Sequence, residues 1–167
     1  TTTPWTLPGN VGLAVGPDVD YVRVRVTATP EKWEGHGGAE IGEELILAKD
    51  LFKEVLRHHC EEIETFPGSD LIGRSYKPLF PGAVDRNGSE TAWTVIGADW
   101  VTTTDGTGVV HTAVMYGEDD YNLGKEVGLP AQHTVGIDGA FLEGTHADLD
   151  GRYVKDCDET IIGLLHD

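Results

Sequence analysis

The chain has 167 residues, of which 39% are hydrophobic, and this is enough for one domain with a core that needs no disulfides. Its 29 acidic residues outnumber its 12 basic ones, so the net charge of −17 repels phosphate backbones and any nucleic acid must be held mostly elsewhere. No apolar run approaches the roughly 20 residues needed to cross a bilayer, so we expect no membrane partner. Cys60 and Cys157 stand far apart, outside any CxxC spacing, which favours buried thiols in a cytoplasmic protein over a secreted scaffold.

The first ten residues, TTTPWTLPGN, place three adjacent threonines before two prolines. Proline fixes φ and pushes the preceding residue toward extended geometry, so this segment predicts a stiff extended ribbon. Alternation along such a ribbon puts Thr1, Thr3 and Trp5 on one face, and Thr2 and Thr6 on the other. The hydroxyls and backbone amides could then ring a small polar ligand. The alternative is an edge strand, in which threonines occur because β-branched residues suit sheets.

Several short strands are predicted along the first hundred residues. Apolar or alternating runs indicate strands at 11–15, 22–26, 44–48 and 93–101, and the glycine-rich segment 29–42 indicates a loop.

A helix is predicted over 51–63, because its apolar residues share one helical stripe and Asp50 can cap it. The adjacent His58, His59 and Cys60 do not make a metal site, since neighbouring helical residues point about 100° apart and no fourth ligand follows. We therefore expect no metal.

The second informative stretch is DGTGVVHTAVMYGEDDY, from 105 to 121. It predicts a strand at 109–112 and a helix that starts at Glu118 and ends near Gly128. Taken alone, acidic residues at a helix start are caps favoured by the macrodipole, and His111 is a half-buried strand histidine.

Short strands at 134–135 and 141–142 and a final helix at about 158–165 complete the prediction. Many short strands with few helices favour a mainly β fold, a closed or nearly closed β-barrel with peripheral α-helices.

Taken together, TTTPWTLPGN and the later GTGVVH followed by GEDDY resemble the editing domain of isoleucyl-tRNA synthetase. The family's spacing also occurs at Leu71, Gly73, Tyr76, Pro78, Leu79 and Phe80. The related valyl and leucyl editing domains typically carry arginine in place of Thr3 and an acidic residue in place of Trp5, which selects the isoleucyl branch. One departure is Val114, where the family commonly has proline. The resemblance implies a single editing domain over 1–167, excised from a larger synthetase whose ATP-using synthetic site is absent from this chain.

The implied activity is hydrolysis of valine wrongly esterified to isoleucine tRNA, with valyl-adenylate as a further substrate. A pocket sized for valine excludes isoleucine, because forcing one extra methylene into a packed site costs about 1–3 kcal/mol. The implied partners are the tRNA 3′ end carrying valine and the remainder of the synthetase. Editing needs no cofactor, and we expect the isolated domain to be monomeric.

The resemblance also assigns residues. Asp120 matches the aspartate that holds the substrate's α-ammonium, while Thr2 and Thr3 match threonines that contact the ester and orient the attacking water. These three form the implied catalytic set. The implied substrate-binding set, which shapes or borders the aliphatic pocket, is Thr1, Trp5, Thr6, Asn10 and His111. No residue is an obvious strong base, so catalysis would depend on positioning a water molecule.

Two alternatives come from other classes of protein. An N-terminal nucleophile hydrolase would attack with Thr1. A non-catalytic module would bind the tRNA end or a partner surface without hydrolysis.

Overall fold

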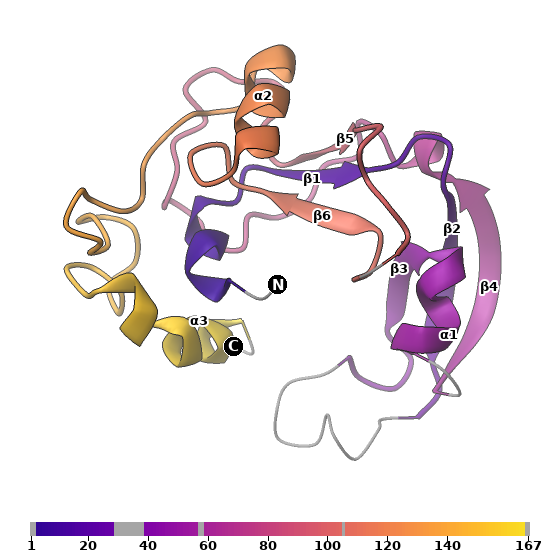
Figure 1. The fold of residues 1–167 in the computed structure, drawn as a ribbon. Coiled ribbons are helices and arrows are strands. Elements are labelled where there is room, and N and C mark those ends of the chain that lie inside the picture. The colour runs from indigo at the N-terminus through magenta and orange to yellow at the C-terminus, as the bar shows by residue number, and fades with distance from the viewer. Residues whose placement is uncertain (1–2, 29–38, 57–58, 105, 166–167) are drawn as a thin grey trace. The chain divides into compact units, whose positions relative to one another are not determined.

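The computed structural model describes residues 3–28, 39–56, 59–104 and 106–165 (Figure 1). The strands are β1 (Gly12–Val15), β2 (Asp20–Val26), β3 (Glu44–Ala48), β4 (Cys60–Pro67), β5 (Thr94–Gly97) and β6 (Val109–Thr112). The α-helices are α1 (Phe52–Val55), α2 (Glu118–Val127) and α3 (Asp158–Leu164). The short 3₁₀ helices are η1 (Pro4–Gly9), η3 (Lys49–Leu51), η4 (Gly68–Asp70) and η5 (Val154–Asp156). None of the described helices is long and apolar enough to cross a membrane.

The described strands form two small open sheets, with strand orders β5-β1-β6 and β3-β2-β4. The prediction of a closed or nearly closed barrel is therefore wrong, although the fold is mainly β. A barrel needs every strand to pair on both sides. Within the described segments only the central strands β1 and β2 do so, and β5 and β6 are four residues long.

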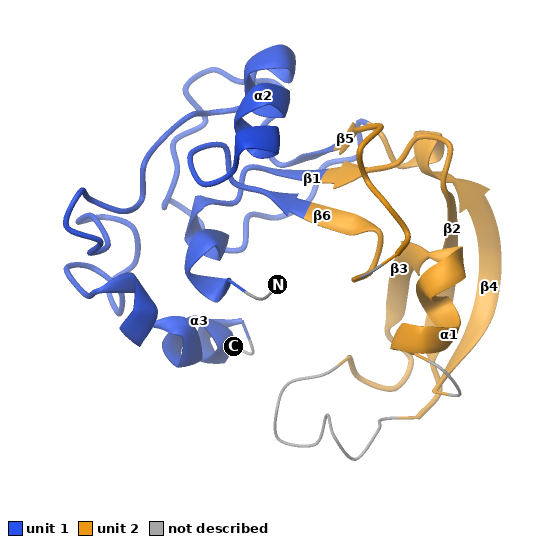
Figure 2. Cartoon of the chain, viewed as in Figure 1, with its two compact units in different colours: residues 1–13, 73–95, 111–167 blue, residues 14–72, 96–110 orange. Residues whose placement is uncertain are grey.

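The chain divides into two compact units, which Figure 2 shows in different colours. Unit 1 comprises residues 1–13, 73–95 and 111–167, and unit 2 comprises residues 14–72 and 96–110. Each unit is assembled from separate stretches of chain. The single domain expected over 1–167 stays a prediction.

Strand β2 is the centre of the sheet in unit 2 and confirms the predicted alternation. Val22, Val24 and Val26 are buried, while Arg23 and Arg25 point to the other face. These arginines form exposed ion pairs with acidic residues of the two flanking strands, with N to O distances of 2.8–3.3 Å to Glu44, Glu61 and Glu64. Exposed pairs of this kind contribute little because water screens their charges, so the buried valines dominate the stability of the sheet.

The helix predicted over 51–63 is wrong beyond its first turns. Helix α1 ends at Val55, and residues 60–67 instead form β4, antiparallel to β2. Arg23 faces Glu64 and Val24 faces Glu62, so Ile63 is an extra residue in a bulge. The bulge removes the period-two pattern by which a strand is recognised, which explains the wrong prediction.

The core of unit 1 gathers apolar side chains from η1, from loops and from α3. Its buried members are Leu7, Phe80, Ala83, Phe141, Leu149, Val154, Cys157 and Ile161. Helix α3 matches the predicted final helix, and α2 ends at Val127 with Gly128 as its C-cap at φ of +77°, as that glycine predicted. The strands expected near 134 and 141 reduce to isolated bridges, between Val135 and Phe141 and between Ala140 and Tyr153.

Candidate functional site

The threonine-proline segment forms η1 instead of the predicted extended ribbon or edge strand. The fixed φ of proline also suits a 3₁₀ helix, and Pro4 occupies the first helical position, where a missing N–H is no loss. Side chains three residues apart eclipse in such a helix. Thr6 accordingly donates twice to the carbonyl of Thr3, from its amide at 3.2 Å and from Oγ1 at 2.9 Å. The predicted placement of Thr3 and Thr6 on opposite faces is therefore wrong.

His111, on strand β6, binds the side chain of Thr6. Its Nε2 lies 2.9 Å from Thr6 Oγ1, and its Nδ1 lies 3.2 Å from Asn10 Nδ2. Because the hydroxyl proton of Thr6 is donated to Thr3, Oγ1 must accept from Nε2–H. Asn10 Nδ2 can only donate, so Nδ1 accepts, and His111 is the neutral tautomer with its proton on Nε2. Burial lowers the pKa of His111 to about 4, which agrees with a neutral ring.

Asn10 follows η1 and is almost fully buried, with 4% of its surface exposed. Its Nδ2 also donates to the carbonyl of Gly12 at 3.0 Å, and its Oδ1 accepts from the hydroxyl of Tyr76 at 2.6 Å. The indole Nε1 of Trp93 donates to its carbonyl at 3.1 Å. Both polar atoms of the Asn10 side chain thus have hydrogen-bond partners, and these bonds fix the orientation of its amide group.

Asp120 lies in the first turn of α2 and reaches back to the end of β6. Its Oδ2 accepts a hydrogen bond from the amide of Ala113 at 3.1 Å, two residues beyond His111. Burial raises the pKa of Asp120, and the bond from Ala113 opposes that shift. The half-buried carboxylate is thus held near the strand that carries His111.

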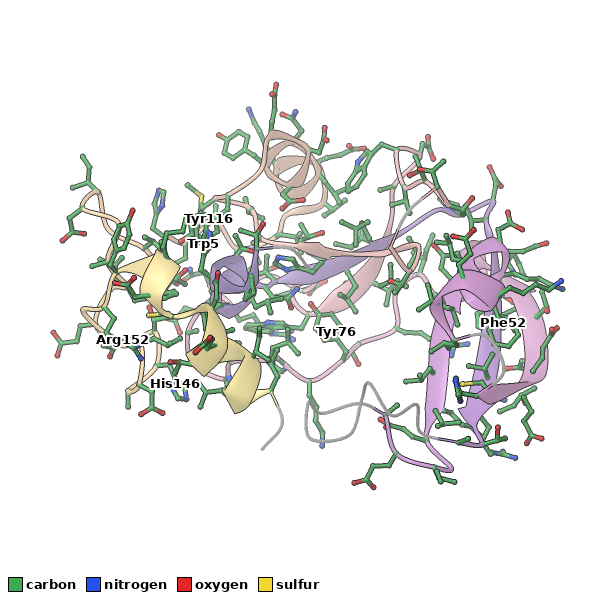
Figure 3. The ribbon with its side chains drawn as sticks, turned by 60° about the horizontal axis from the view of Figure 1, so that its bottom comes forward. Trp5, Phe52, Tyr76, Tyr116, His146 and Arg152 are labelled. Carbon is green, nitrogen blue, oxygen red and sulfur yellow. The ribbon has the colours of Figure 1, made fainter. Side chains whose placement is uncertain are left out.

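Trp5 lies on another side of η1, against Tyr116, with ring centroids 5.2 Å apart in an edge-to-face arrangement (Figure 3). The two rings border a pocket of about 640 Å³. Its further lining includes His133, Val135, Leu142 and Val154. Of the predicted site residues that the structure describes, only Trp5 lines this pocket.

The structure therefore unites part of the predicted site. One hydrogen-bonded network contains Thr3, Thr6, Asn10 and His111. The Asp120 carboxylate is bonded to the amide of Ala113, which follows His111 by two residues. Thr1 and Thr2 lie outside the described residues. Within the described segments, no group of three or more His, Cys, Asp or Glu side chains is arranged to hold a metal ion.

Sequence reasoning gave no role to Tyr76 or Tyr116. Tyr76 reaches Asn10 because its amide bonds the carbonyl of Trp93 at 3.0 Å, a tertiary contact with no local sequence signal. Tyr116 bonds Thr134 through its hydroxyl at 2.8 Å. Only the family spacing that includes Tyr76 could have drawn attention to the first of them.

No protein-family model matches the sequence. The chain is 41% identical over 168 residues to isoleucine–tRNA ligase of Bdellovibrio bacteriovorus, which covers 99% of this chain and 15% of that protein. It is also 41% identical over 165 residues to isoleucine–tRNA ligase of Bacillus thuringiensis, over 99% of this chain and 14% of that protein. The chain thus spans about one seventh of the length of these relatives.

Comparison with solved structures identifies the fold. The editing domain of the cytosolic leucyl-tRNA synthetase of P. falciparum matches with a TM-score of 0.68 at 9% identity, over 99% of this chain and 74% of that one. The corresponding P. knowlesi domain matches with a TM-score of 0.63 at 12% identity, over 99% and 79% of the two chains. The chain is therefore similar over almost its whole length to one segment of isoleucine–tRNA ligases, and has the fold of a leucyl-tRNA synthetase editing domain.

Proposed function

We propose that this chain hydrolyses the ester of valine wrongly attached to isoleucine tRNA. The observation that carries the proposal is the convergence of Thr3, Thr6 and His111 in one network, beside the strand end that anchors the Asp120 carboxylate. The identity to isoleucine–tRNA ligases over almost the whole chain and the editing-domain fold support it.

In the proposed reaction, the oxygen of a water molecule attacks the ester carbonyl carbon. The bond between that carbon and the ribose oxygen breaks, valine leaves with the water hydroxyl, and the ribose oxygen takes the remaining proton. Thr2 and Thr3 orient the water and the ester, and backbone amides stabilise the developing oxyanion. The step uses water and the substrate alone, without a cofactor.

His111 is unsuited to act as the general base in this reaction. Both of its ring nitrogens are engaged, and with a pKa of about 4 the neutral ring is a weak base at neutral pH. Its role in the proposal is to hold Thr6. Efficiency then comes from placement of the water, not from proton abstraction by the ring.

Asp120 supplies the negative charge for the substrate's α-ammonium. A half-buried carboxylate binds an ammonium more strongly than an exposed one, because less water competes for both charges. The site would therefore reject esters without a free amine. N-acetylated valyl-tRNA should be a poor substrate for this reason.

The test compares deacylation of valyl and isoleucyl esters of isoleucine tRNA by the wild-type protein, Asp120→Ala and Asp119→Ala. Asp119 is the neighbouring, exposed carboxylate of α2 and serves as the matched control. We expect wild type and Asp119→Ala to cleave the valyl ester faster than the isoleucyl ester, and Asp120→Ala to lose cleavage. Binding of the tRNA end without cleavage by wild type would instead support the non-catalytic module. Equal cleavage by wild type and Asp120→Ala would refute the role of Asp120.

A further inference from the structure

The hydrogen bonds around His111 continue beyond the predicted site to Tyr76, a half-buried side chain whose hydroxyl lies 2.6 Å from Asn10 Oδ1. Oδ1 can only accept, so the tyrosine hydroxyl is the donor. Burial raises the pKa of Tyr76, so the hydroxyl keeps its proton throughout the physiological range. The Oδ1 atom of Asn10 therefore always faces a hydrogen-bond donor, the Tyr76 hydroxyl.

The orientation of the Asn10 amide decides which nitrogen of His111 carries the proton. With Oδ1 turned to Tyr76, Nδ2 faces His111 and can only donate, so the ring must accept at Nδ1 and protonate Nε2. If the amide turned over, Oδ1 would face the ring and favour a proton on Nδ1. We propose that Tyr76 is a positioning residue that acts through Asn10 to fix the Nε2–H tautomer of His111.

The tautomer matters for Thr3. In the observed arrangement Nε2 donates to Thr6, which leaves the Thr6 hydroxyl proton for the Thr3 carbonyl. With the proton on Nδ1, Nε2 would become an acceptor and compete with the Thr3 carbonyl for that hydroxyl proton. Tyr76, acting through Asn10, thus favours the observed direction of each hydrogen bond from Asn10 to Thr3. Its effect on hydrolysis rests on the proposed function, whereas its effect on the ring does not.

Tyr76 is itself held in place from the backbone. Its amide donates to the carbonyl of Trp93 at 3.0 Å, and Trp93 Nε1 donates to the carbonyl of Asn10 at 3.1 Å. Trp93 is thereby bonded to both partners of the tyrosine–asparagine contact. The carbonyl of Gly12, at 3.0 Å from Nδ2, favours the same amide orientation. Removing the Tyr76 hydroxyl takes away one of two restraints and leaves the other.

The first arm of the test measures the ring directly, by ¹⁵N NMR of histidine-labelled protein, with His111→Asn identifying the resonances of His111. In wild type, Nδ1 should show the chemical shift of an unprotonated nitrogen at neutral pH. In Asn10→Asp, a side chain that only accepts faces the ring, so Nδ1 should become protonated. In Tyr76→Phe, Nδ1 should move part of the way toward the protonated shift, because the tautomers exchange. Tyr153→Phe, a half-exposed tyrosine of the same unit, is the control and should leave His111 unchanged.

The second arm measures deacylation of valyl-tRNA. Tyr76→Phe should lower kcat about tenfold with KM nearly unchanged, since one restraint on the network is lost and no substrate contact is removed. Tyr153→Phe should match wild type. If wild type does not hydrolyse the ester, the proposed function fails while the NMR arm still decides the role of Tyr76. A protonated Nδ1 in wild type, or an unchanged His111 spectrum in a folded Tyr76→Phe protein, would overturn the inference.

Discussion

His111 Nε2 lies 2.9 Å from Thr6 Oγ1, although the two residues are 105 positions apart in the chain. The next residue after His111, Thr112, gives a contrast, because its fully buried hydroxyl has no hydrogen-bond partner among the described residues. The Thr6 hydroxyl thus both accepts and donates a hydrogen bond, whereas the Thr112 hydroxyl makes none with the described residues.

This contrast predicts opposite effects of the same substitution. Thr6→Val should lower the free energy of unfolding by about 1–3 kcal/mol, since it leaves the His111 N–H without its acceptor. Thr112→Val should be neutral or stabilise by about 1 kcal/mol, since it replaces an unpaired hydroxyl by a methyl group. Urea denaturation of both variants measures the two changes. Equal losses would show that the Thr6 bond adds nothing to stability.

The low pKa of His111 predicts a pH-dependent stability. Its folded pKa of about 4 lies below the ordinary histidine value of 6.5, so between these values the unfolded chain binds more protons. The stabilisation is complete above pH 6.5 and is lost as the pH falls toward 4, in total about 3 kcal/mol. Many carboxylates titrate in the same range, so the measurement is the difference in unfolding free energy between wild type and His111→Gln across this window. A difference that stays constant from pH 7 to 4.5 would contradict a buried neutral ring.

We expect the charge of Asp120 to lower the stability of the fold while supporting activity. Its pKa is raised by burial, so the charged carboxylate is less favourable in the folded protein than in the unfolded chain. Asp120→Asn keeps an acceptor for the Ala113 amide and removes the charge. It should raise the free energy of unfolding by about 0.5–1 kcal/mol at pH 7 while reducing valyl-tRNA deacylation about 10- to 100-fold.

The pH dependence of the unfolding free energy tests whether removal of the charge causes the stabilisation in Asp120→Asn. Below pH 3.8, the ordinary pKa of an aspartate, the Asp120 carboxyl is protonated in both the folded and the unfolded state, so the gain should vanish there. Asp119→Asn, at the exposed neighbouring position, is the control for both measurements. A gain of equal size at acid pH would mean that the charge is not its source.

Helix α2 packs against Val114 at Gly124, so we expect substitutions at these two positions to have non-additive effects on stability. A Cβ atom on Gly124 would clash with Val114 Cγ2, so Gly124→Ala should destabilise by about 1–3 kcal/mol even though alanine favours helices. In the background of Val114→Ala the same change should cost much less, because the obstructing methyl groups are gone. Chemical denaturation of both single variants and the double variant gives the coupling energy. Additive losses would show that the two side chains do not compete for this space.

Parts of the fold follow directly from local sequence. The valine–arginine alternation of β2 and the acidic start and glycine end of α2 are local signals, and the structure contains both elements. The motif resemblance identified the editing-domain fold, which the solved structures support. Local signals failed at η1, where proline geometry is compatible with two conformations, and at β4, where a bulge hides the strand pattern.

The sequence by itself determined the similarity to isoleucine–tRNA ligases, the mainly β character and the residue types of the candidate site, because motifs and periodic patterns are properties of the chain alone. Tertiary structure decided that the sheets are open and that Thr3 and Thr6 share one helical turn. It also decided that Tyr76 and Asn10 impose a tautomer on His111. The physical reason is that a hydrogen-bond direction depends on which donors and acceptors meet in space, and residues far apart in the chain meet only after folding.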